Sequence, residues 1–131
     1  MKPITKDLKE EIVSYIKRAQ ENFGITLVTE DWGSKPTKCA CPLGCVLLGN
    51  NIDVTDDSEK NAYEAADLLG VSENWIESFI YGFDADDVHP INQEAYQLGL
   101  NIRNEFNPTK HKDYVNNLDP MAVELMGIIN N

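Results

Sequence analysis

Apolar positions near the start of the chain follow a helical period. Within residues 6–23 they are Leu8, Ile12, Tyr15, Ile16, Ala19 and Phe23. Steps of three and four residues place such side chains on one face of a helix, and Gly24 marks its end. The short β-branched run of residues 25–29 then predicts a strand. We expect this strand to pair with residues 51–54.

A loop and a short apolar helix follow. Residues 30–38 contain Gly33, Ser34 and Pro36, a loop composition in which Trp32 is the one large apolar side chain, so we expect Trp32 to hold the loop to the core. Pro42 suits the first position of a helix, because its missing N–H would have no partner there. The residues after it are apolar on nearly every side, which predicts a buried helix.

Two helices in the middle of the chain each have a capping residue and a terminal glycine. The first is capped by Asp57 or Ser58 and ends at Gly70. The second is capped by Ser72 and ends at Gly82. They form the best-defined helix pair in the sequence.

The rest of the chain adds an acidic loop and two further helices. The loop covers residues 84–90, a helix covers residues 92–106, and a last helix follows Asp119 and Pro120. We therefore predict one mainly α domain over residues 1–131, a small orthogonal bundle of about five or six helices with at most a minor two-stranded β-element.

The net charge of -11 changes this picture because it is concentrated in one segment. Between Asp53 and Glu94 there are twelve carboxylates and, counting Lys and Arg, only Lys60. Such a segment repels phosphates and attracts a basic partner, although it can also act only as a solubilising face. The candidates for partner binding are Glu73, Glu77, Asp84, Asp86 and Asp87.

The middle helix pair resembles the helix-turn-helix family. The residues that carry the resemblance, within residues 62–81, are Ala66, Gly70, Val71, Ile76 and Phe79. The resemblance implies a close helix pair whose second helix enters the major groove of DNA. The positions expected on its exposed face, Glu73, Asn74, Glu77 and Ser78, include no Lys or Arg. Because basic contacts to phosphate dominate DNA affinity, this charge pattern disfavours a nucleic-acid partner.

Three closely spaced cysteines are the other candidate for chemistry. Cys39, Cys41 and Cys45, with His89, could hold zinc, although the spacing lacks the paired knuckles of zinc ribbons. Cys41 precedes Pro42, so we expect it to cap the helix, where the helix dipole favours a thiolate and a reactive thiol. Catalysis would also require His89 or His111 within reach. The alternative for each cysteine is a small buried side chain.

These features favour a non-enzymatic domain that binds another macromolecule, with a basic protein as partner. The sequence carries no phosphate-binding loop, no serine-hydrolase motif and no zinc-protease motif. No stretch has the roughly 20 apolar residues of a membrane span, and we expect a cytoplasmic location with reduced thiols. The alternatives are a metal-binding or redox protein that uses the cysteines, a helix-turn-helix nucleic-acid binder, and an acidic mimic of DNA.

Overall fold

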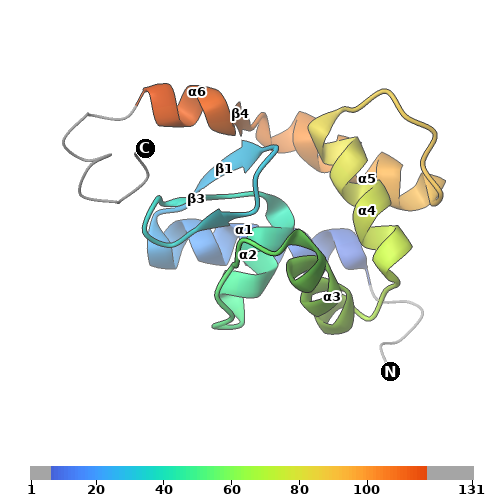
Figure 1. The fold of residues 1–131 in the computed structure, drawn as a ribbon, viewed down its shortest axis with the longest axis horizontal. Coiled ribbons are helices and arrows are strands. Elements are labelled where there is room, and N and C mark those ends of the chain that lie inside the picture. The colour runs from blue at the N-terminus through green and yellow to red at the C-terminus, as the bar shows by residue number, and fades with distance from the viewer. Residues whose placement is uncertain (1–6, 118–131) are drawn as a thin grey trace.

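The computed structural model describes residues 7–117 and is mainly helical over that range (Figure 1). The elements are α1 (Leu8–Phe23), β1 (Thr26–Thr29), β2 (Gly33–Ser34), β3 (Cys39–Ala40), α2 (Pro42–Gly49), α3 (Ser58–Leu69), α4 (Glu73–Asp84), α5 (Gln93–Phe106), β4 (Thr109–Lys110) and α6 (His111–Asn116). The predicted fold class, a small helical bundle, is confirmed. None of the described helices is long and apolar enough to span a bilayer.

The helix ends follow the predicted capping chemistry. The side chain of Asp57 accepts hydrogen bonds from the backbone N–H groups of Glu59 and Lys60 at the start of α3, and Ser72 accepts one from Trp75 at the start of α4. Gly70 adopts the left-handed conformation, φ 71°, that closes α3. The two predicted helices are therefore present, and α3 contacts α4.

The sheet is larger than expected and uses different partners. Its four strands lie in the order β2-β3-β1-β4, and β1 pairs in parallel with both β3 and β4. The predicted pairing of β1 with residues 51–54 is therefore wrong. Asn51 has φ 60°, and the Ile52 N–H donates to the carbonyl of Leu47, so this segment closes the end of α2 instead of extending as a strand.

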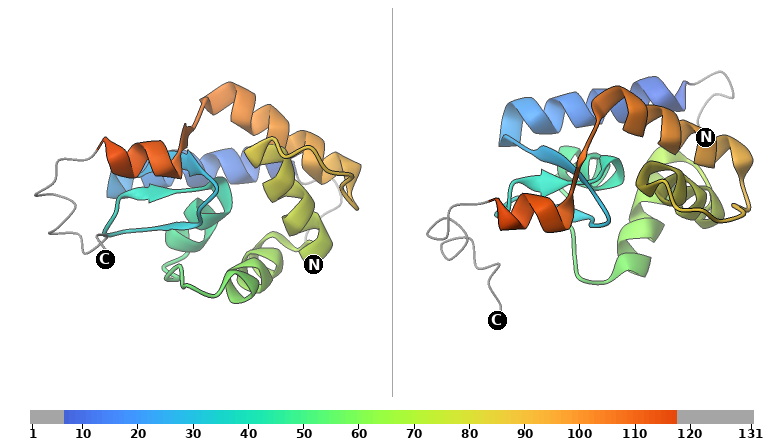
Figure 2. Two further views of the ribbon diagram at one scale, coloured as in Figure 1. Left: turned by 45° about the horizontal axis from the view of Figure 1, so that its top comes forward. Right: turned by 90° about the horizontal axis from the view of Figure 1, so that it is seen from above.

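The core is built around α2, as the all-round apolar pattern predicted. α2 contacts α1, α3 and the strands β2 and β3, and its residues from Pro42 to Leu48 are buried. Figures 1 and 2 show the sheet and α6 at one end of the molecule and α4 with α5 at the other, with α1 running along both. Trp32 packs against this core from the β1–β2 loop, as expected.

Helix α4 continues beyond Gly82, where the sequence predicted its end. It runs to Asp84, and Ala85 closes it in the left-handed conformation, φ 59°. Gly82 therefore lies inside the helix. A Cβ at this position would overlap the backbone carbonyl of Tyr96 on α5, which explains why the residue is glycine. Gly99 on α5 meets the backbone of Phe79 in the same way. Both glycines therefore serve close helix packing, and neither ends a helix.

The chain after α5 differs from the prediction as well. The short helix α6 was not predicted, and the Tyr114 hydroxyl fixes it to the sheet by donating to the Thr37 carbonyl at 2.6 Å. The last predicted helix, after Asp119 and Pro120, lies outside the described residues.

Candidate functional site

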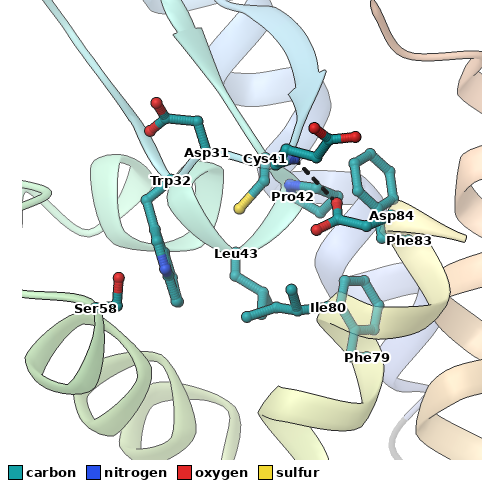
Figure 3. A pocket seen from close by; sticks show the side chains of 11 residues that line it. Asp31, Trp32, Cys41, Pro42, Leu43, Ser58, Phe79, Ile80, Phe83 and Asp84 are labelled. Carbon is teal, nitrogen blue, oxygen red and sulfur yellow. Dashed lines mark hydrogen bonds between the residues drawn. The ribbon is translucent and has the colours of Figure 1, made fainter. Parts of the chain in front are cut away.

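A cavity of about 300 Å³ opens between the β1–β2 loop, the first turn of α2 and one side of α4 (Figure 3). Its lining residues are Glu30, Asp31, Trp32, Cys41, Pro42, Leu43, Ser58, Phe79, Ile80, Phe83 and Asp84. The cavity brings together a thiol, three carboxyl groups and three aromatic rings that lie far apart in the sequence.

Cys41 occupies the predicted helix cap and faces the cavity (Figure 3). Its Sγ accepts a hydrogen bond from the Gly44 N–H at 3.4 Å. Burial nevertheless raises the pKa of this thiol to about 12, against the lowering effect of the Gly44 and Leu43 N–H groups, and nearby Asp84 and Asp31 add to the rise. The expected thiolate is thus not favoured, because loss of water outweighs the start of a short helix.

The other predicted metal ligands lie in separate environments. The Cys39 Sγ lies 3.3 Å from the hydroxyl of Thr37, Cys45 is buried in α2, and His89 is exposed in the α4–α5 loop. Within residues 7–117 no group of three His, Cys, Asp or Glu side chains is placed to hold a metal ion. The three cysteines are free thiols.

Neither histidine completes a catalytic pair with Cys41. The His111 Nε2 lies 3.2 Å from an oxygen of Asp31, so this ring is directed to a carboxylate. No hydrogen bond joins His89 or His111 to Cys41 in the described part of the chain. The arrangement needed to activate a thiol as a nucleophile is not formed.

Asp84 is the most unusual charged group of the cavity. One of its oxygens accepts a hydrogen bond from the Glu30 N–H at 3.0 Å, the dashed line in Figure 3. Burial raises the pKa of this carboxyl to about 6; Asp86 and Glu30 add to the rise, whereas the Glu30 N–H and Arg103 lower it. Among the described residues no cation forms an ion pair with Asp84. A half-buried carboxylate without a counter-ion is typical of a functional site.

The backbone is strained on both sides of this contact. Glu30 has φ 68° and Ala85, next to Asp84, has φ 59°, a left-handed region that residues with a Cβ rarely adopt. Such conformations persist where the surrounding structure imposes them, and they cluster at functional sites. Two of the five such non-glycine residues among those described therefore flank this contact, while Lys38, Asn51 and Asn107 lie elsewhere.

A second depression, about 450 Å³ in volume, continues from the cavity between α3 and α4. Trp32, Ser58 and Ile80 line both hollows. Glu59, Glu73 and Glu77 line the second one. We call the two hollows together the acidic groove; its carboxyl groups are Glu30, Asp31, Glu59, Glu73, Glu77 and Asp84. No Lys, Arg or His lines it among the described residues.

The candidates for partner binding divide into two sets. Glu73, Glu77 and Asp84 line the acidic groove, whereas Asp86 and Asp87 are exposed in the α4–α5 loop outside it. Ser78, expected on the exposed face of α4, is buried, and its hydroxyl accepts a hydrogen bond from the Asn92 N–H.

Sequence reasoning missed most of the groove residues on the β1–β2 loop. Glu30 and Asp31 were not among the candidates, and Trp32 was expected only to anchor the loop. The available signal was weak: loops often carry binding residues, and this one places two acids directly before an aromatic side chain.

The acidic groove offers carboxylates beside apolar side chains, and within the described residues only Asp31 among them forms an ion pair, with His111. The partly exposed side chains of Trp32 and Ile80 supply apolar surface to both hollows, whereas Leu43, Phe79, Phe83 and Ile76 line them with almost no exposed area. This combination attracts a cation that carries an apolar stem. Comparisons of the chain with protein-family models, with curated proteins and with solved structures find no match.

Proposed function

We propose that this chain is a non-enzymatic interaction domain whose acidic groove binds a basic segment of another protein. The observation that carries the proposal is the set of six groove carboxyl groups, of which only Asp31 has a basic partner, His111, within the described residues. In the described part of the chain none of the groove acids forms an ion pair with Lys or Arg.

Charge complementarity supports a basic partner, and the groove walls support a peptide-like one. Opposite charges across an interface speed association and select the partner, while buried apolar contacts supply affinity. Trp32 lies at the junction of the two hollows, and aromatic side chains at such positions commonly dominate binding energy. A cytoplasmic location belongs to the same proposal, because free thiols persist in reducing compartments.

The alternatives receive less support from the same residues. Phosphates of a nucleic acid would be repelled by Glu73 and Glu77, which occupy the side of α4 that a DNA reader would present. A mimic of DNA would display its carboxylates on a protruding surface, whereas Asp84 here lies in a cavity. A redox or nucleophilic role would require a more acidic Cys41 thiol than its burial allows.

The test uses a short fluorescein-labelled peptide in which lysine alternates with leucine, and fluorescence anisotropy as the measurement. We expect saturable binding that weakens as salt rises, and no binding of a matched peptide in which glutamate alternates with leucine. Equal binding of both peptides, or of neither, would contradict the proposal.

A matched pair of variants assigns the binding to the groove. The groove variant carries Glu59→Gln, Glu73→Gln and Glu77→Gln. Its control carries Asp86→Asn, Asp87→Asn and Glu94→Gln, three exposed acids of the same acidic segment outside the groove. Both variants lose the same charge, so a selective loss of binding in the groove variant separates a local site from a general electrostatic attraction.

A further inference from the structure

Resting on the proposed function, we infer that the cavity beside Asp84 is the binding site for one alkylammonium group, supplied by a lysine side chain of the basic segment. A lysine side chain would be anchored at one defined place in a groove that otherwise selects only for positive charge. The cavity, its apolar walls and the Asp84 oxygen that accepts no hydrogen bond from a described residue are the features that point to it.

The cavity has room for an extended amine side chain. Its volume is about 300 Å³, and the partly exposed side chains of Trp32 and Ile80 give it apolar walls for a chain of methylene groups. Figure 3 shows Trp32 and Phe79 on opposite sides of the hollow, with Asp84 above Phe79. A cation whose stem lies along the Trp32 ring gains packing and cation–π attraction in addition to the ion pair.

Asp84 supplies the acceptor for the ammonium group. The Glu30 N–H occupies one of its oxygens, and no described residue donates to the other. Arg103, whose charge lowers the pKa of Asp84, instead donates through Nη1 to the carbonyl of Phe83 at 2.7 Å. Asp84 therefore presents a carboxylate oxygen without a partner at the wall of the cavity, and a bound cation would supply that partner.

The same geometry favours ammonium over guanidinium. A guanidinium group recognises a carboxylate best in a bidentate manner, through both oxygens at once. At Asp84 the Glu30 N–H already uses one acceptor position on one oxygen, so a two-point contact would have to share that oxygen with the backbone donor. An ammonium group donates in three separate directions and needs only the remaining oxygen.

Binding should be coupled to the protonation of Asp84. The charged or titratable groups around it are Glu30 on the β1–β2 loop, Asp86 after α4, Arg103 on α5, and Cys41 at the start of α2. A bound ammonium favours the ionised carboxyl, so the ligand must displace a proton wherever the free site is protonated. Because the pKa of free Asp84 is about 6, binding should weaken as the pH falls below that value.

The experiment uses n-butylammonium as the probe, followed by the NMR chemical shift of the Glu30 amide in the full chain. We expect a saturable shift with n-butylammonium, a response at least about tenfold weaker with n-butylguanidinium, and none with n-butanol. Asp84→Asn should abolish the response while the Asn carbonyl still accepts from Glu30, and the control Asp86→Asn should retain it.

The outcomes separate this inference from the proposed function. If the lysine peptide binds but n-butylammonium gives no saturable shift and Asp84→Asn leaves peptide affinity unchanged, the lysine anchor is overturned and the acidic groove stands. If n-butylammonium binds but the peptide does not, the cavity site is supported and the protein-binding function is overturned. Equal responses to n-butylammonium and n-butylguanidinium would overturn the selectivity for ammonium.

Discussion

The two sides of α4 differ in how closely they are packed and in whether their charged groups have counter-ions. Toward α5 the helix is closely packed, because Gly82 admits the backbone of Tyr96 and Gly99 of α5 meets the backbone of Phe79. Toward α3 and the β1–β2 loop the same helix presents acids without counter-ions beside a cavity. The contrast suggests that one side specifies the fold and the other serves binding, so substitutions should separate the two.

The largest effect is expected on the packed side, from Gly82→Ala. The added Cβ would overlap the Tyr96 carbonyl, which is backbone and cannot rotate away, so we expect a loss of about 3 kcal/mol or more in the free energy of unfolding. Urea denaturation measures it. Gly24→Asn is the control: no atom lies near its added Cβ, and Asn tolerates the left-handed backbone there, so its cost should stay below about 1 kcal/mol.

A similar loss is expected in α3, from Ala66→Glu. Ala66 is buried, and a carboxylate there would have to enter the core or push the helix away, at a cost on the order of 3 kcal/mol. Thermal unfolding followed by circular dichroism measures it. Tyr63→Glu, at an exposed position of the same helix, should cost much less, and equal costs would show that α3 does not pack as described.

These packed elements are the ones that sequence reasoning predicted best. The spacing of apolar residues in α1, the caps Asp57 and Ser72, and the proline at the start of α2 are local signals, and each is confirmed. Gly82 misled the prediction because a glycine that ends a helix and one that admits a neighbouring helix look alike until the neighbour is known. The pairing of β1 with β3 and β4 depends on contacts between distant segments and leaves no local trace.

Only some residues of the candidate site could be predicted from the sequence. The concentration of acids identified Glu73, Glu77 and Asp84, because charge can be counted along a sequence. The role of Glu30 could not be found that way, since it arises from a backbone N–H that meets Asp84 across the fold. The thiol of Cys41 shows the same limit, because the helix cap is local whereas burial is not.

A smaller effect on stability is expected from Asp84→Asn, and it depends on pH. The folded pKa of about 6 lies above the ordinary value of 3.8, so the proton on Asp84 stabilises the fold at low pH, and this contribution is lost as the pH rises through about 6. The variant should therefore be more stable than wild type near neutral pH, and the difference should shrink as the pH falls toward 4. Melting temperatures of both proteins across this range measure it. A variant that is less stable at neutral pH would contradict an unpaired Asp84.

The smallest effect is expected from Ala85→Gly, which relieves backbone strain beside the groove. Ala85 closes α4 with φ 59°, and glycine adopts this conformation without a steric cost, so we expect a gain of at most about 1 kcal/mol in the free energy of unfolding. Urea denaturation again measures it. Ala62→Gly, inside α3, should instead destabilise the protein by a comparable amount. A loss at both positions would mean that Ala85 does not hold a left-handed conformation.

The central claim is that the acids of the groove bind a basic segment, and it is tested most directly by titrating the labelled lysine–leucine peptide into three proteins at several salt concentrations. We expect Glu59→Gln, Glu73→Gln and Glu77→Gln together to raise the Kd by about tenfold or more at low salt, and the difference from wild type to narrow as the Debye length falls below about 8 Å. The matched variant with Asp86→Asn, Asp87→Asn and Glu94→Gln should stay close to wild type. Equal losses in the two variants, or unchanged binding in both, would contradict the claim and leave the acidic segment as a solubilising surface.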